Sequence, residues 1–146
     1  MPDSQPSRML AVLLGASEFP KSPQLLESRS FYNSAYDVRE YLCDGTGLAL
    51  PRANVLSLFN DTRSSSDQLE EIAGFLENRE QQLKSVGSSP SQLLIYYVGH
   101  GLFTRGAEQA YCLAVRNTNE NNLGPTSMRA ADLADVVKER ARHLKR

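Results

Sequence analysis

The sequence LLIYYVGHGLF, residues 93–103, decides the fold that we predict for this chain. Its first part is rich in branched and aromatic side chains, which favour a buried strand. The run then meets His100, which stands between Gly99 and Gly101. The chain contains 2 histidines, and one of them therefore lies at the end of its most strongly predicted strand.

Other segments also predict strands. Residues 9–14, MLAVLL, form an unbroken apolar run that is too short for a helix and resembles a strand buried on both faces. Residues 54–59 predict a second strand, residues 92–98 a third, and residues 111–115 a shorter fourth one. Residues 16–31, which follow the first strand, predict a long loop.

Three helices are predicted from caps and from apolar spacing of about 3.6 residues. The first is expected to start at an N-cap on Asn33 or Ser34, and the last at a cap on Thr126 or Ser127. The middle helix starts with Ser65 and Gln68, which resemble a capping box, and runs to about Lys84. The residues expected to face inward are Ala35, Val38, Tyr41 and Leu42 in the first helix, Leu69, Ile72, Ala73, Leu76 and Leu83 in the second, and Leu133, Val136, Val137 and Ala141 in the third.

Strands that alternate with helices predict an α/β domain with a mostly parallel sheet and helices on both faces. Residues 1–8 are polar, carry two prolines and are expected to be disordered, whereas residues 9–146 are expected to form the domain. The predicted sheet has only three core strands, so the last predicted helix would have little sheet to cover. We therefore expect the 146 residues to be part of a longer protein, with the domain incomplete at its C-terminus.

Composition narrows the function class. A hydrophobic fraction of 40% and a charged fraction of 23% are typical of a globular protein, and a net charge of -1 gives no reason to expect a nucleic-acid or acidic-membrane partner. Neither a signal peptide nor a long apolar run is present, so we expect a cytoplasmic protein. Cys43 and Cys112 match no CxxC pattern, even when pooled with His100 and His143. We expect no disulfide, no metal and no cofactor.

His100 is the candidate for chemistry. Ligands in open α/β sheets bind at the carboxyl ends of the strands, and an imidazole accepts and returns protons near neutral pH. Gly99 permits a sharp turn, and Gly101 offers an unhindered N–H of the kind that forms an oxyanion hole. The residues alone also allow His100 to be a turn residue or a partly buried polar residue. No GxSxG motif supplies a serine nucleophile, and both cysteines are expected to be packing residues.

Three segments together resemble a known family. YYVGHG (96–101), AVLLGAS (11–17) and NSAYDVREYL (33–42) are similar to the large-subunit half of the caspase-like cysteine peptidases, which include caspases, paracaspases and metacaspases. The likeness is strongest to bacterial caspase-family domains and extends over residues 9–146. It implies a three-layer caspase-like sandwich, in which His100 is the catalytic histidine and the N–H of Gly101 helps to hold the oxyanion.

The resemblance also implies a basic specificity. Metacaspases and paracaspases place an acid at the start of the first helix, where it lines the S1 pocket and binds Arg or Lys of the substrate. The matching residue is Asp37. Without the resemblance, Asp37 is better explained as a first-turn acid that the helix dipole favours. Glu18 and Arg29 either rim the same cleft or are solvated loop charges, and Tyr97 is expected to be a core aromatic residue.

The family's nucleophilic cysteine follows the last of these helices, in a segment of the form D-x-C, so it is expected beyond residue 146. The resemblance therefore implies a cysteine endopeptidase that acts on a protein or peptide in regulated proteolysis, such as bacterial defence cell death. This chain alone is expected to be inactive until it contacts the C-terminal part of the same protein. A non-catalytic α/β interaction module stays open as an alternative. So does a flavodoxin-like binding domain, although GASEFP has one glycine where a phosphate loop needs several.

Overall fold

The computed structural model describes residues 8–106 and 109–141 as an α/β arrangement with two small sheets. The elements in chain order are β1 (Met9–Gly15), α1 (Arg29–Cys43), the 3-10 turn η2 (Arg52–Asn54), β2 (Val55–Ser57), α2 (Ser65–Ser85), β3 (Gln92–Val98), β4 (Gly101–Phe103), β5 (Tyr111–Leu113), the 3-10 turn η3 (Glu120–Asn122), α3 (Leu123–Thr126), β6 (Met128–Arg129) and α4 (Ala130–Arg140). The disorder predicted for residues 1–8 concerns a segment of which 1–7 lie outside the described residues.

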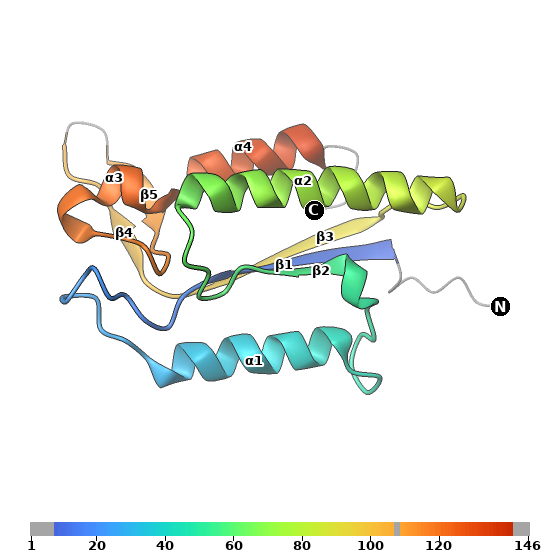
Figure 1. Cartoon of the computed structure of the whole chain (residues 1–146), viewed down its shortest axis with the longest axis horizontal. Coiled ribbons are helices and arrows are strands. Elements are labelled where there is room, and N and C mark those ends of the chain that lie inside the picture. Colours follow the sequence, from blue (N-terminus) through green and yellow to red (C-terminus); the bar gives the residue numbers. More distant parts are fainter. Residues whose placement is uncertain (1–7, 107–108, 142–146) are drawn as a thin grey trace.

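The main sheet is parallel and has the strand order β2-β1-β3. The strand β1 is central and fully apolar, and it pairs with β3 along its whole length, from Met9 opposite Gln92 to Gly15 opposite Val98. Because α1 connects β1 to β2 and α2 leads from β2 back across β1 to β3, the two helices lie on opposite faces of the sheet (Figure 1). The predicted α/β class with a parallel sheet and helices on both faces is therefore confirmed.

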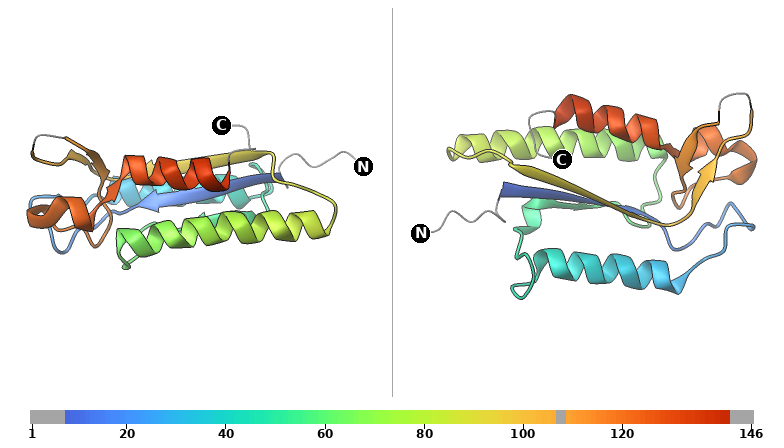
Figure 2. Two further views of the ribbon diagram at one scale, coloured as in Figure 1. Left: turned by 90° about the horizontal axis from the view of Figure 1, so that it is seen from above. Right: turned by 180° about the vertical axis from the view of Figure 1, so that it is seen from behind.

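Alternate residues of β1 belong to two separate apolar clusters. Leu10, Val12 and Leu14 pack with Ile72 and Leu76 of α2, and Leu133, Val136 and Val137 of α4 cover the same cluster. On the other face, Ala11 and Leu13 pack with Val38 and Leu42 of α1. The helices α2 and α4 lie side by side on one face of the sheet (Figure 2). These two layers explain why β1 is buried on both faces.

The second sheet is antiparallel, with the order β4-β5-β6, and it stands at the carboxyl end of the parallel strands (Figure 1). It begins directly after His100, because β4 starts at Gly101. The strands β4 and β6 and the helix α3 were not predicted, since segments of two to four residues carry no readable periodicity and exist through their tertiary pairing.

Several predicted boundaries are wrong. Helix α1 begins after Ser28 and not at Asn33 or Ser34, and Tyr41 is 58% exposed instead of facing inward. The N-cap of α2 is Ser64, whose hydroxyl accepts a hydrogen bond from the N–H of Asp67, so the predicted capping box is one residue out of place. The last helix has its N-cap at Arg129, and β2 and β5 are shorter than predicted. Helix α2 and strands β1 and β3 match their predicted bounds within one residue.

No helix among the described residues has the length and apolar character needed to cross a membrane.

Candidate functional site

The candidate site lies where the chain leaves β1 and β3 at the carboxyl edge of the parallel sheet. The backbone N–H of Ala16 donates to the carbonyl of Val98 at 3.2 Å, so the two strands stay together one residue beyond the ladder. From there the loop after β1 leads to α1 on one face, whereas β3 leads into β4 and finally to α4 on the other face. Adjacent strands whose connections separate in this way form the crevice in which α/β proteins bind ligands.

The imidazole of His100 is held by this loop. Its Nε2 atom lies 2.8 Å from the backbone carbonyl oxygen of Leu26. The ring is tilted against that of Phe19, with 5.0 Å between centroids, and meets Phe31 edge-on at 5.2 Å. Leu26 and Phe19 come from the loop after β1 and Phe31 comes from the first turn of α1, so two consecutive segments fix the orientation of this side chain.

The bond to Leu26 determines the tautomer of His100. A carbonyl oxygen can only accept, so Nε2 must carry the hydrogen and donate it. In the neutral imidazole, Nδ1 then carries the lone pair and is the nitrogen that can take up a proton. Nδ1 makes no hydrogen bond to any described residue. The ring is half-buried, so one nitrogen is anchored and the other is available for proton transfer.

The backbone of His100 is fixed as firmly as its ring. Its carbonyl oxygen accepts a hydrogen bond from the N–H of Ala114 at 2.9 Å and lies 2.8 Å from the Tyr97 hydroxyl. That hydroxyl lies 2.8 Å from the carbonyl of Ala114 as well, and it has one hydrogen to share between the two. Burial, followed by the neighbouring phenol of Tyr111, raises the pKa of Tyr97 far above its usual value, so the hydroxyl stays a donor.

Gly101 presents its N–H away from the antiparallel sheet. The N–H of Thr104 donates to Ala110, and the N–H of Ala114 donates to His100, so residues 100, 102 and 104 face β5. The residue between them, Gly101, therefore directs its N–H toward the free edge of β4. A side chain at Gly101 would collide with the Tyr111 hydroxyl. This geometry leaves the N–H beside His100 accessible to a ligand oxygen.

Gly99 lies in a space too tight for a side chain, directly before His100. Its φ of 157° lies at the limit of the left-handed region, and an added Cβ would come within 2.7 Å of the Tyr97 hydroxyl. Because that hydroxyl is anchored to two carbonyls, it cannot move aside. A side chain is therefore excluded at Gly99 by Tyr97 and at Gly101 by Tyr111.

Asp37 lies apart from these residues. It is exposed in the middle of α1, eight residues after Arg29 and so about 12 Å along the helix axis from the helix start. The expectation of a first-turn acid is wrong, because the first turn of α1 contains no acidic residue. Asp37 has no described hydrogen bond or ion pair, and the structure does not bring it into contact with His100.

Glu18 and Arg29 line a cavity of about 580 Å³ beside the start of α1. Its described lining includes neither His100 nor Asp37. Glu18 is not free there, because its carboxylate accepts from Arg116 at 2.6 Å. Arg29 lies over the ring of Tyr32, 5.3 Å from its centroid. The cavity opens at the carboxyl ends of β1 and β2, where Asn60 joins Ser17 through two hydrogen bonds.

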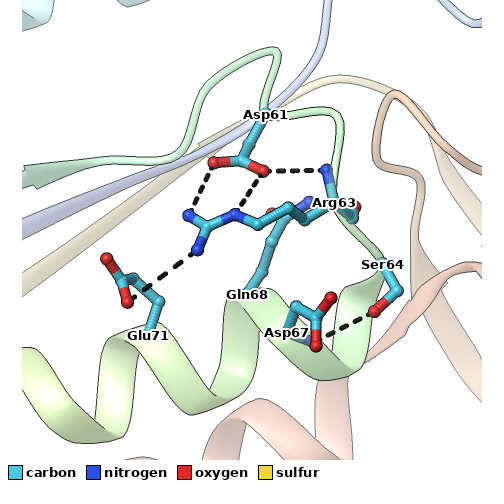
Figure 3. A network of polar contacts seen from close by, with 6 residues as sticks. All are labelled: Asp61, Arg63, Ser64, Asp67, Gln68 and Glu71. Carbon is cyan, nitrogen blue, oxygen red and sulfur yellow. Dashed lines mark hydrogen bonds and ion pairs between the residues drawn. The ribbon is translucent and has the colours of Figure 1, made fainter.

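A polar network connects the loop after β2 to the first turns of α2 (Figure 3). The guanidinium of Arg63 donates to both carboxylate oxygens of Asp61, at 3.0 and 2.8 Å, and lies 3.9 Å from Glu71. The Arg63 hydrogen bonds hold the pKa of the Asp61 carboxyl below its usual value. The guanidinium of Arg63 is thus paired with two carboxylates of the network, while Asp67 takes part through its backbone N–H, which donates to the Ser64 hydroxyl. The network therefore shapes the start of α2.

Neither cysteine can act with His100 in the described residues. Cys112 is fully buried in β5, where its thiol approaches the carbonyl of Ala110 at 3.7 Å. Cys43 is the last residue of α1, at the end of the helix that points away from the site (Figure 1). Among the described residues, no three His, Cys, Asp or Glu side chains gather as metal ligands. His143 lies outside them.

The residues that hold His100 could not have been found from the sequence. Leu26 contributes only a backbone atom, and Phe19 and Phe31 have no pattern that distinguishes them from core residues. Tyr97 packs against the apolar core as predicted, but its hydroxyl also has a partner that only the turn of the chain after β3 provides.

Comparisons with protein-family models, curated proteins and solved structures found no match for this chain. What the chain does must therefore be inferred from the site itself.

Proposed function

We propose that this chain carries the histidine half of a caspase-like cysteine endopeptidase site. The observation that supports it best is the anchored imidazole: Nε2 of His100 donates to Leu26, and Nδ1 is left as the proton acceptor beside the outward N–H of Gly101. A base next to an oxyanion donor is the arrangement that acyl transfer needs. The YYVGHG segment supports the family resemblance.

In this proposal a thiolate from a segment outside the described residues attacks the scissile carbonyl. His100 delivers a proton to the leaving amine, and the N–H of Gly101 binds the oxygen that becomes negative. The substrate is a protein or peptide cleaved after Arg or Lys, and the setting is regulated proteolysis. Because Cys112 is fully buried and Cys43 lies at the far end of α1, the chain by itself binds without cleaving.

The test uses the longest protein that contains this chain and a fluorogenic peptide with Arg before the scissile bond. His100→Ala is expected to lower kcat/KM by at least about 100-fold, since positioned acid–base groups contribute about 100- to 10,000-fold. His143→Ala, which changes the other histidine, is the control and is expected to cleave normally. Retained cleavage in His100→Ala would remove His100 from the mechanism and with it this proposal.

Asp37 is the proposed source of the basic specificity. If its carboxylate binds the substrate cation, Asp37→Ala reduces the preference for Arg and Lys over neutral residues and leaves the chemistry intact. The matched control is Glu40→Ala, which removes an exposed acid one turn further along α1. An unchanged preference in Asp37→Ala would assign the specificity to other residues.

An interaction module is the second candidate, and the burial of Cys112 favours it for the isolated chain. One measurement separates this candidate from the peptidase. An interaction module never cleaves its partner, and the wild-type chain and His100→Ala should bind that partner equally well.

A further inference from the structure

We propose that the cavity between β4 and α3 binds the leaving half of the peptide substrate and selects acidic side chains there. This inference rests on the proposed function. The cavity has a volume of about 940 Å³, which is within the usual range for ligand sites. Its walls include Leu25, Leu102, Phe103, Arg105, Glu120 and Arg129.

The position of the cavity follows from its neighbours in the chain. Leu25 precedes Leu26, whose carbonyl holds the imidazole of His100. On the opposite wall, Leu102 follows Gly101 in β4. The two segments that fix His100 and the oxyanion donor thus continue directly into the two walls of the cavity, which begins one residue beyond them on each side.

The chemistry of the site determines which half of the substrate the cavity would receive. In acyl transfer, the acid–base residue gives its proton to the nitrogen of the leaving amine. The part of the substrate that departs therefore extends from the side of the histidine. A cavity that adjoins His100 through both of its anchoring segments is placed for the residues that follow the scissile bond.

The charges at the cavity favour a negative ligand. Among the residues that the structure describes, Arg105 and Arg129 line it together with a single acid, Glu120. The carboxylate of Glu120 accepts a hydrogen bond from the backbone N–H of Gln24 at 3.3 Å, so this acid is already partly neutralised by a donor of the cavity wall. The guanidinium of Arg129 lies against Gly124 of α3, where a side chain Cβ would be 3.2 Å away. No described residue forms an ion pair with either arginine.

The apolar part of the cavity favours a peptide over a small anion. Phe103 is 61% exposed, and its ring is tilted by 59° against that of Tyr111, with 5.1 Å between the centroids. Phe103, together with Leu25 and Leu102, offers apolar contact for a peptide chain, and the two arginines of the same lining offer hydrogen-bond donors for its carboxylates. A single inorganic anion would use only the second of these.

The proposal is tested by binding, without any cleavage step. A fluorescent peptide with Asp and Glu after a basic residue, and the same peptide with Asn and Gln, are titrated with the 146-residue chain. We expect about 5-fold tighter binding of the acidic peptide, as two partly exposed ion pairs allow, and a smaller difference at high salt. Amide NMR signals of residues 101–105 and 123–129 should shift on binding.

Charge-matched variants locate the interaction. Arg129→Gln and Arg105→Gln are each expected to remove most of the acidic preference, whereas Arg39→Gln, which removes the same charge from the exposed face of α1, is expected to keep it. Equal binding of both peptides, no binding, or equal loss in Arg39→Gln would overturn the proposal. Because the assay involves no catalysis, such a result leaves the His100→Ala test of the peptidase unaffected.

Discussion

At the scale of single residues, Tyr97 is the clearest case of one atom that holds a site together. Its hydroxyl lies 2.8 Å from the carbonyls of both His100 and Ala114, and it connects β3 to the end of β5. Removing this partly buried donor from two carbonyls costs more than the hydrogen bond itself, because both acceptors lose part of their pairing.

We therefore expect Tyr97→Phe to lower the free energy of unfolding by about 1–2 kcal/mol, measured by urea titration. The ring NMR signals of His100 should also shift or broaden. Tyr96→Phe is the control, since the neighbouring hydroxyl has no hydrogen bond among the described residues, and its effect should stay below about 0.5 kcal/mol. Equal stability of Tyr97→Phe and wild type would show that the hydroxyl does not fix the turn.

Gly15 is the second residue whose identity the structure requires. Its φ is 119°, and an added Cβ would overlap the carbonyl of Val98, a backbone atom in the paired strand that cannot move aside. Gly74 in α2 offers the contrast, because nothing lies within 4 Å of an added Cβ there.

The two glycines should respond to alanine with opposite signs. Gly15→Ala is expected to destabilise the chain by at least about 2 kcal/mol or to prevent folding. Gly74→Ala is expected to stabilise it by about 0.5–1 kcal/mol, because alanine favours a helix interior. Thermal and urea unfolding measure both, and a Gly15→Ala chain as stable as wild type would contradict the strand geometry described above.

At the scale of an element, the start of α2 shows how local charges define a helix end (Figure 3). Ser64 caps the helix, and the pair of Asp61 and Arg63 closes the loop in front of it. Since the folded carboxyl of Asp61 has a lowered pKa, it releases its proton more readily than in the unfolded chain. The resulting stability is fully present above the usual titration range of Asp and is lost as the pH falls through the lowered pKa.

Asp61→Asn should therefore lower the free energy of unfolding by about 0.5–1 kcal/mol at neutral pH, as expected for a partly exposed ion pair. In acid, the difference between Asp61→Asn and wild type should disappear. Urea titrations at several pH values measure this, with Asp67→Asn as a control that keeps the loop pair. A difference that is constant with pH would mean that the charge of Asp61 contributes nothing.

The helix α1 shows the opposite case, in which tertiary contacts decide where an element begins. The segment before Asn33 has no apolar spacing that predicts a helix, yet the helix starts at Arg29. Phe31 in its first turn packs on His100, and Ser28 is joined to Ser17 by a backbone hydrogen bond of 2.9 Å. These contacts between distant segments stabilise a turn that the local sequence does not favour.

At the scale of the molecule, the sheet ends at β3, which has no described partner on its outer edge. The strand has seven residues, and none of them is charged or proline. Its Leu94 is 38% exposed on the face shared with α1. A long apolar edge with free backbone groups is a template for pairing with another chain.

We expect the chain alone to self-associate at high concentration and Leu94→Lys to weaken this association, because a charge opposes edge-to-edge pairing. Sedimentation velocity over a range of concentrations measures the effect. Val86→Lys, which replaces an apolar residue 75% exposed at the end of α2, is the control and should not change the association. Equal association of wild type and Leu94→Lys would exclude β3 as the contact.

The sequence by itself determined the strands β1 and β3, the helix α2, the α/β class and the position of His100 directly after a strand. These follow from apolar runs, helical spacing and glycines, which act over a few neighbouring residues. Only the tertiary structure decided which nitrogen of His100 is free, that Gly101 turns its N–H outward, and that Asp37 lies in the middle of a helix. The first depends on Leu26, the second on the pairing of β4 with β5, and the third on the contacts of Phe31 and Ser28 at the start of α1. Each is a contact between distant segments that no local pattern encodes.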